Sequence, residues 1–284
     1  MTFSIVARTS DGQSYGVAVA SKFLAVGAAV PAAEVAIGAI ATQATANLAY
    51  RPQGVALLRH GATAAQTVAG LIAADPGRKT RQLGVVGVSG DGATFTGDEC
   101  NAWAGGCSGD GYACQGNILT GPDVVAELER AWLAGSPDAP LATRLLAALA
   151  AGDAAGGDRR GRQSAAVYVV SPAAGYGGGS DVAVDLRVDD HPEPIPELRR
   201  LLSLHELYFG RPDPTRALPL QGGLAQEVRS HLDALGQPDL QTWMGVENYE
   251  ERDVPGAIDP LVLDKLREAA QPPGATMARR ATTP

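Results

Sequence analysis

Residues 2–8 read TFSIVAR and residues 15–21 read YGVAVAS, two short runs whose side chains alternate with a period of two. This period is typical of β-strands. An Asp-Gly pair at residues 11–12 lies midway between the runs and favours a two-residue hairpin turn. In an antiparallel pair joined there, the numbers of opposite residues sum to 23, so we expect Thr2 to lie opposite Ser21.

Further strands and helices follow in groups rather than in strict alternation. Strand-like segments occur at residues 35–43, 82–88, 93–96, 112–118, 164–170 and 182–188. Helical segments are expected at residues 48–75, as two helices divided near residue 60, and at 123–133, 141–151 and 196–207. The Gly- and Arg-rich residues 152–161 are expected to form a mobile loop. Groups of strands separated by groups of helices predict the α+β class, with two antiparallel sheets packed face to face between helical layers.

The C-terminal part of the chain is predicted to form a small second domain. The proline-rich segment 210–221 reads as a linker between a first domain at residues 1–209 and a helical domain at 222–271. Candidate helices in the second domain are residues 223–235, 240–249 and 259–270. Residues 272–284 are expected to be a flexible tail.

Composition restricts the possible partners and the cellular location. The 23 basic and 31 acidic residues leave a net charge of −8, which argues against nucleic acid or an anionic membrane as a partner. The N-terminal sequence lacks the features of a signal peptide, and no apolar run reaches the roughly 20 residues of a membrane span. We therefore expect a cytoplasmic protein that forms a homo-oligomer. The even spacing of the three cysteines matches no zinc pattern, so we expect buried thiols, no metal and no cofactor.

Thr2 is the first candidate catalytic residue. Removal of Met1 would leave a threonine with both a hydroxyl and a free α-amine, whose reference pKa is about 7.7 to 8.0. Such an amine can accept the hydroxyl proton and later return it, so one residue supplies nucleophile and base. The ordinary alternative is a threonine that only starts a strand. Ser21 could hydrogen-bond Thr2 and Lys22 could bias its protonation, although strict alternation turns Lys22 to the opposite sheet face.

Five segments in consistent order resemble a known family. They are TFSIVAR at residues 2–8, GVAVASKF at 16–23, ATQ at 41–43, QGN at 115–117 and DLRVDDHP at 185–192. Together they resemble the bacterial family called domain of unknown function 1028, which is grouped with the N-terminal-nucleophile (Ntn) hydrolase-like fold. Over residues 2–207 this resemblance implies a four-layer αββα sandwich with Thr2 at the active-site end of the first strand. It does not imply a substrate.

A second resemblance covers residues 222–270. This segment, notably WMGVENYEER at 243–252, is similar to the "putative peptidoglycan-binding domain" often fused behind that family. For a cytoplasmic chain we expect a docking, dimerisation or substrate-lid role rather than binding to intact cell wall. Trp243 and Tyr249 are expected to be core residues.

Acyl transfer also needs donors directed at the developing oxyanion. The amides of Gln115 and Asn117 flank Gly116, where the backbone can be approached closely, and we expect this element to bind the oxyanion or to orient the substrate. Each amide could instead cap a loop. The candidate substrate-binding residues are Ser4, Gln43, Asn47, Gly116 and Arg187. Arg187 could clamp a substrate carboxylate or form only a structural ion pair.

These residues lead to three hypotheses. The first is an Ntn-type amidohydrolase that cleaves a small amide or peptide-like substrate with Thr2 as nucleophile. The second is a non-catalytic protein on the same scaffold that binds a small metabolite or a muropeptide. The third moves an enzyme site to the cluster Asp189, Asp190 and His191, with Ser164 as a possible nucleophile, although no Gly-x-Ser-x-Gly elbow is present.

Overall fold

The computed structural model describes residues 2–271, so Met1 and the tail expected at 272–284 lie outside the described residues. The chain divides into two compact units between Leu202 and Ser203. This division falls inside helix α6 (Pro194–Phe209) rather than in the proline-rich segment that follows it. The reason is packing: the start of α6 contributes Leu198 to the core of the first unit, and its end contributes Leu207 to the core of the second.

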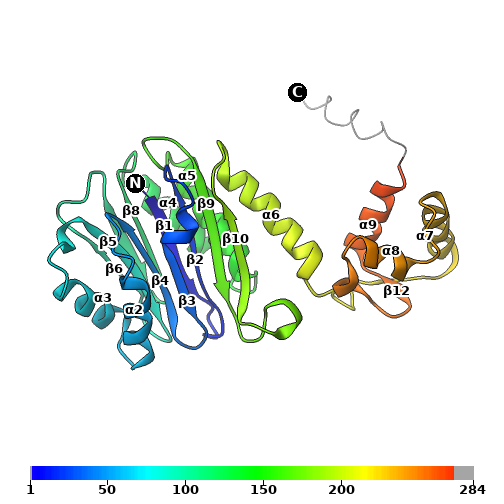
Figure 1. Cartoon of the computed structure of the whole chain (residues 1–284), viewed down its shortest axis with the longest axis horizontal. Helices are drawn as coiled ribbons and strands as arrows, with labels where there is room; N and C mark the ends of the chain where they lie inside the picture. Colours follow the sequence, from blue (N-terminus) through cyan, green and yellow to red (C-terminus); the bar gives the residue numbers. More distant parts are fainter. Residues whose placement is uncertain (1, 272–284) are drawn as a thin grey trace. The chain divides into compact units, whose positions relative to one another are not determined.

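The larger sheet of the first unit has the strand order β10-β9-β2-β1-β8-β7, with every neighbouring pair antiparallel. Its strands are β1 (Thr2–Arg8), β2 (Tyr15–Ser21), β7 (Gly105–Gly109), β8 (Tyr112–Asn117), β9 (Ser164–Val170) and β10 (Val182–Val188). The first two strands therefore lie in the middle of the sheet, where Figure 1 shows them in dark blue.

The predicted hairpin register is confirmed. Pairs from Phe3–Ala20 to Arg8–Tyr15 all have numbers that sum to 23. The connection is longer than a two-residue turn, because a hydrogen bond of 3.0 Å from Thr9 N to Ser14 O closes a wider loop. This loop is still centred on the Asp-Gly pair, so the register is unchanged.

The smaller sheet has the order β3-β4-β5-β6. Its strands are β3 (Pro31–Glu34), β4 (Gly38–Ala44), β5 (Arg81–Gly87) and β6 (Ala93–Thr96). Neither β3 nor β7 was predicted. Both are short and only partly buried, and β7 has the sequence GGCSG, so small residues replace the β-branched and aromatic side chains that mark a strand.

The helices of the first unit are α1 (Val26–Ala29), α2 (Tyr50–Arg59), α3 (Ala64–Ala73), α4 (Asp123–Ala134) and α5 (Leu141–Ala154), with short 3-10 turns η1 (Arg78–Thr80) and η2 (Tyr176–Gly178). The short α1 contributes Val26 to the core between the sheets, whereas the other four helices cover the outer faces. α4 and α5 pack on the larger sheet, and α2 and α3 pack on the smaller one. Between the sheets lies a third core that includes Val6, Val19, Ala39 and Val86. The α+β prediction is confirmed, and the layers are visible in Figure 1.

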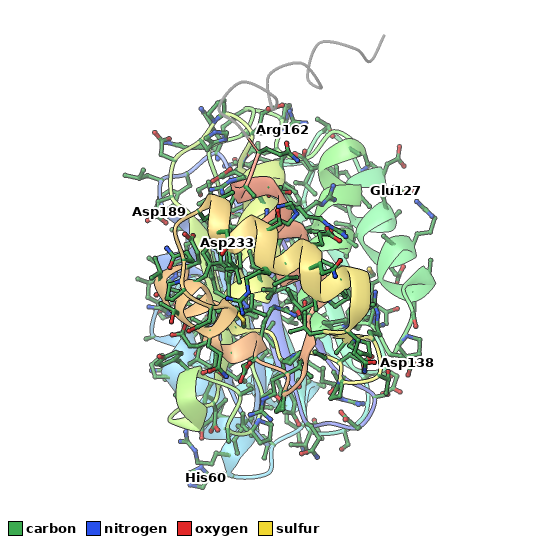
Figure 2. All side chains as sticks on the ribbon, turned by 90° about the vertical axis from the view of Figure 1, so that its right-hand side faces the viewer. His60, Glu127, Asp138, Arg162, Asp189 and Asp233 are labelled. Carbon is green, nitrogen blue, oxygen red and sulfur yellow. The ribbon has the colours of Figure 1, made fainter. Side chains whose placement is uncertain are left out.

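Local sequence explains where several of these helices begin and end. α3 starts at a capping box, in which Thr63 Oγ1 accepts a hydrogen bond from Gln66 N while the Gln66 side chain accepts one from Thr63 N. The expected break between α2 and α3 occurs at His60 and Gly61, where Gly61 has a φ of 88°. His60 is exposed, as Figure 2 shows at the lower edge of the molecule.

Residues 152–161 do not form the expected mobile loop. α5 continues to Ala154, and beyond it Gly157 and Asp158 are buried. The Gly157 carbonyl accepts a hydrogen bond from Thr120 N, and the Asp158 carboxylate accepts one from Arg160 N. A Gly- and Arg-rich composition suggested mobility, but one buried aspartate orders the segment because its charge needs hydrogen-bond donors.

The second unit is a small, mainly helical domain. Its elements are β11 (Leu218–Pro219), α7 (Gly222–Ala234), α8 (Leu240–Val246), η3 (Glu250–Arg252), β12 (Ala257–Ile258) and α9 (Pro260–Ala269). Trp243 and Tyr249 are buried in its core, as expected for packing residues. No helix within residues 2–271 is long and apolar enough to cross a membrane.

Candidate functional site

A layer of buried polar side chains lies between the two sheets of the first unit, at the end of β1 where the described chain begins. In each strand, polar residues occupy positions that alternate with positions facing the helices, so they point toward the opposite sheet. The members of this polar layer are Thr2, Ser4, Ser21, Gln43, Gln82, Gln115 and Asn117. All carry hydroxyl or amide groups, so the layer holds no formal charge.

Thr2 lies at the edge of this layer, and its neighbours hold it on two sides. Its Oγ1 is 3.1 Å from Ser21 Oγ, as the hairpin register predicts. Its backbone carbonyl accepts hydrogen bonds from Gln43 Nε2 at 3.2 Å and from Asn117 Nδ2 at 3.4 Å. Thr2 is only 6% exposed, so its hydroxyl and backbone have fixed directions.

Gln82 joins the amides into one network, and it was not among the residues singled out from the sequence. Its Oε1 accepts hydrogen bonds from Gln43 Nε2 and Asn117 Nδ2, both at 2.9 Å. Its Nε2 donates to Gly116 O at 2.7 Å. A glutamine at an inward position of an otherwise apolar strand was the available signal, since a buried amide needs several partners.

Ser4 and Gln115 lie one step deeper between the sheets. Ser4 Oγ donates to Gln43 Oε1 at 2.7 Å and accepts from Gln115 Nε2 at 2.6 Å. A Cβ on Gly84 would lie 2.0 Å from Gln115 Oε1, so the glutamine side chain fits only because residue 84 is glycine. Gln115 is fully buried and its nitrogen is directed at Ser4.

In the expected oxyanion element at residues 115–117, both side-chain amide nitrogens already donate hydrogen bonds within the polar layer. Gly116 pairs with Phe3 on one side and with Gly105 on the other, inside the sheet. Asn117 directs its Nδ2 at Thr2 and Gln82, so the 115–117 segment orients Thr2 with donors that already have partners.

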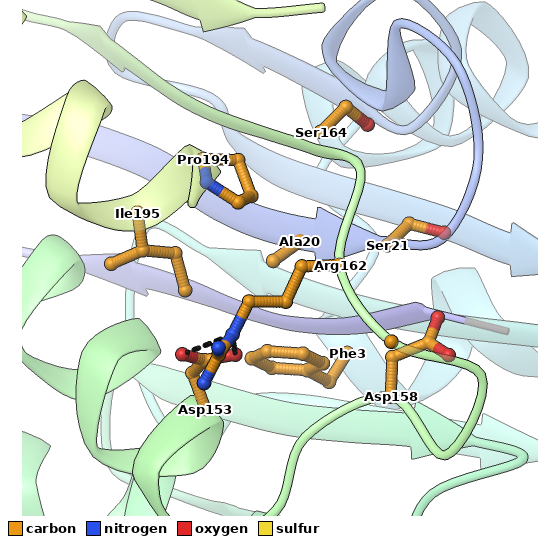
Figure 3. Close-up of a pocket in the computed structure, with 10 residues that line it drawn as sticks. Phe3, Ala20, Ser21, Asp153, Asp158, Arg162, Ser164, Pro194 and Ile195 are labelled. Atoms are coloured by element: carbon orange, nitrogen blue, oxygen red, sulfur yellow. Dashed lines mark hydrogen bonds and ion pairs between the residues drawn. The ribbon is translucent and has the colours of Figure 1, made fainter. Parts of the chain in front are cut away.

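Two buried side chains fix the backbone that follows Ser21. Asp158 Oδ2 accepts a hydrogen bond of 2.7 Å from Lys22 N. Ser164 Oγ accepts one of 3.1 Å from Val26 N and donates to the carbonyl of Phe23. Figure 3 shows Ser21, Asp158 and Ser164 around this strand end. The Ser21 hydroxyl is therefore held on a rigid segment.

Lys22 is turned away from the polar layer. Its side chain is exposed, and its Nζ donates to the carbonyl of Arg162 at 3.2 Å. Arg162 itself pairs with Asp153, drawn with dashed lines in Figure 3. This arrangement agrees with the strand alternation and gives Lys22 a different partner from Thr2.

A cleft of about 190 Å³ opens beside Asn117. It is lined by Ala44, Thr45, Thr80, Glu99, Cys100, Asn101, Asn117 and Ile118. Because Asn117 is the strand partner of Thr2, the cleft reaches the same end of the sheets as Thr2. The loop residues 99–101 were not expected here, since no periodic pattern marks them.

Asn47 belongs to a different cluster, which supports one wall of this cleft. Its Nδ2 donates to Asp75 Oδ2 at 3.3 Å, and Tyr50 and Arg81 donate to the same oxygen at 2.8 and 2.9 Å. The Arg81 guanidinium, followed by the Tyr50 hydroxyl, holds the pKa of Asp75 well below its usual range. Arg81 also donates to Thr45 O at 2.6 Å, which ties the cluster to the cleft.

Arg187 and the acidic segment beyond it lie outside the polar layer. Arg187 forms a two-bond ion pair with Asp185 at 2.8 and 2.9 Å, and this pairing raises the pKa of Arg187. Asp189, Asp190 and His191 are exposed, and Figure 2 shows Asp189 at the edge of the molecule. His191 Nδ1 accepts a hydrogen bond from the backbone of residue 193.

The cysteines are largely packing residues. Cys107 and Cys114 face each other across β7 and β8, and burial, reinforced by the neighbouring thiol, raises the pKa of Cys114. Cys100 is half-buried in the cleft wall, where its thiol donates to the carbonyl of Arg81 and burial raises its pKa.

Comparison with known families identifies the first unit. Residues 2–198 match the family described as "Family of unknown function (DUF1028)", and the chain belongs to this family. Residues 208–266 match the model described as "Putative peptidoglycan binding domain". No curated protein matches the chain.

Two solved structures are similar to the chain. A crystal structure of a DUF1028 protein from Silicibacter pomeroyi has 29% sequence identity and a TM-score of 0.65, and the match covers 80% of this chain and 92% of that one. Anbu, an ancestral β-subunit from Yersinia bercovieri, has 15% identity and a TM-score of 0.32, with coverage of 71% and 93%. The first comparison agrees with the family assignment.

Proposed function

We propose that the first unit is an Ntn-type amidohydrolase that cleaves a small amide or peptide-like substrate. The observation that carries this proposal is the placement of Thr2: its hydroxyl lies 3.1 Å from Ser21 Oγ, and two amides hold its carbonyl. These hydrogen bonds hold Thr2 at the edge of the polar layer and beside a cleft, so its hydroxyl is pre-organised for reaction.

In the proposed reaction, cleavage of the Met1–Thr2 bond first releases the Thr2 α-amine. The amine takes the proton of the Thr2 hydroxyl as Oγ1 attacks the substrate carbonyl carbon, which gives a tetrahedral intermediate. Collapse of the intermediate breaks the C–N bond, and the amine returns its proton to the leaving nitrogen. Water then attacks the acyl-threonine ester and restores the hydroxyl.

The neutral polar layer suits an amine that acts as a base. Burial disfavours the charged ammonium form, and none of the amides or hydroxyls around Thr2 carries a negative charge that would stabilise it. The reference pKa of a free α-amine is about 8. We expect kcat/KM to rise with pH through that value, because only the neutral amine can accept the hydroxyl proton.

The proposal is tested on the processed full-length chain. Intact-mass measurement reports whether Met1 is absent, and its retention would exclude this mechanism. A panel of small amides, ureides and γ-glutamyl compounds then reports turnover. Thr2→Ala should abolish turnover with unchanged folding, whereas Thr2→Ser should retain part of it. Thr143→Ala, an exposed helix position, serves as the matched control.

The alternative is a non-catalytic protein that binds a small metabolite or a muropeptide. The match of residues 208–266 to the peptidoglycan-binding model favours it. Thermal stabilisation by muropeptides, together with a retained Met1 and no turnover, would support this second function over the first.

A further inference from the structure

The side chains that line the cleft beside Asn117 carry charge of one sign only, which is negative. Of the described residues that line it, Glu99 carries a carboxylate and the others are threonines, asparagines, a cysteine and apolar residues. None of these lining residues is Lys, Arg or His. A ligand with a negative charge would meet a carboxylate without a compensating cation in the lining, whereas a positive charge or several N–H groups would find acceptors.

Glu99 can turn its carboxylate to a ligand at small cost. Its present partner is Lys79 Nζ at 3.4 Å, and the two side chains are 56% and 57% exposed. An ion pair this long and this exposed contributes little to stability, because water and salt screen it. The backbone of Glu99 is fixed, since its N–H donates to the carbonyl of Lys79 at 2.8 Å. The carboxylate can therefore exchange Lys79 for a ligand while the backbone of the wall keeps its hydrogen bond.

The size of the cleft limits the ligand. An apolar cavity of about 150 Å³ accepts a molecule the size of benzene, so about 190 Å³ holds roughly six to eight non-hydrogen atoms. The walls are pre-formed: Arg81 Nη1 donates a hydrogen bond to the carbonyl of Thr45, and the carbonyl of Arg81 accepts one from the thiol of Cys100. A muropeptide or an extended peptide would not fit inside this volume.

We infer that the cleft binds the cationic end of a short amide, with an ammonium group facing Glu99 and the amide group directed toward Thr2. The placement of the amide group at Thr2 rests on the proposed function, whereas the binding of the ammonium group at Glu99 does not. Asn117 lies between the two ends, since it lines the cleft and is paired with Thr2 across the strands.

Three amides with one carbon skeleton test the charge preference: 4-aminobutyramide, butyramide and succinamate. On the processed full-length protein we expect kcat/KM to be about twofold to fivefold higher for 4-aminobutyramide than for butyramide, and lowest for succinamate. Glu99→Gln should reduce the ratio of kcat/KM for 4-aminobutyramide to kcat/KM for butyramide toward one. Asp98→Asn removes a neighbouring carboxylate outside the cleft lining and should leave the ratio unchanged. A preference for succinamate, or the same ratio in Glu99→Gln, would overturn the inference.

A binding measurement separates this inference from the proposed function. Calorimetric titration of the Thr2→Ala protein with 4-aminobutyramide requires no turnover. If 4-aminobutyramide binds, and Glu99→Gln weakens its binding by the factor expected for the kcat/KM ratio, the cleft assignment holds even when no amide is hydrolysed. If all three amides are hydrolysed at equal rates, the proposed function holds and the charge assignment fails.

Discussion

Asp158→Asn tests whether one buried carboxylate holds the strand end beside Thr2. The Asp158 side chain is 2% exposed, and its two oxygens accept hydrogen bonds from Lys22 N at 2.7 Å and Arg160 N at 2.8 Å. Asparagine has nearly the same size but offers one oxygen and one NH2 group. One of the two backbone N–H groups must therefore face a second donor and lose its partner.

The magnitude follows from that lost acceptor. Leaving a buried donor unsatisfied costs about 1–3 kcal/mol, with the charge-assisted bond at the upper end. When the N–H that loses its acceptor is that of Lys22, which follows Ser21 directly, the Ser21 hydroxyl is also released from its position. On the proposed mechanism, kcat/KM should fall about tenfold to a hundredfold, as misplacement of a positioned group commonly does.

Asp153→Asn is the matched control, because Asp153 lies in the same small pocket shown in Figure 3. Its partner Arg162 is 48% exposed, so loss of this ion pair should cost about 0–1 kcal/mol. Native-state hydrogen exchange of the β2 amides in increasing urea, read by mass spectrometry, reports the stability of the first unit. If Asp158→Asn stays within about 0.5 kcal/mol of Asp153→Asn, the assignment of Asp158 is refuted.

Two further predictions concern ion pairs, one buried and one partly buried. In the second unit, Arg252 and Asp259 are 3% and 6% exposed and lie 3.0 Å apart, so Arg252→Met should destabilise that unit by about 3–5 kcal/mol. Hydrogen exchange of the α8 amides in increasing urea measures this loss, and an unchanged midpoint would contradict it. In the first unit, Arg81 lowers the pKa of Asp75 below its unfolded value of about 3.8, so the stabilisation is present above that pH and is lost as pH falls toward the folded pKa. Urea midpoints of the first unit between pH 6 and about pH 3 should therefore fall less steeply in Asp75→Asn than in the natural chain, and equal slopes would show that the carboxylate is not the titrating group.

Short-range sequence patterns were sufficient for most elements of the first unit. The register of β1 and β2 follows from their period of two and from the centre of their loop. In an antiparallel pair the numbers of opposite residues have a constant sum, and the centre of the loop sets that sum. The break between the two helices was predicted from His60 and Gly61, and in the structure Gly61 has a positive φ and Thr63 caps the second helix. These signals are local, so no knowledge of the rest of the chain is needed to recognise them.

The positions of the side-chain amides relative to Thr2 could be seen only in the tertiary structure. Gln43 and Gln82 belong to the smaller sheet, and they meet Thr2 and Asn117 only because the two sheets pack face to face. Asn47 was expected at the same site, yet it turns to Asp75. An isolated amide in a sequence has many equally good partners, and only packing selects among them.

The sequence by itself therefore determined the family, the α+β class and the contact of Thr2 with Ser21, because each depends on residues close together in the chain or on ordered motifs. The tertiary structure decided which amides surround Thr2, that Asp158 orders a glycine-rich segment, and that a cleft with one carboxylate opens beside Asn117. Those features depend on contacts between segments distant in the chain, where burial favours hydrogen bonds between polar groups whose partners local composition does not specify.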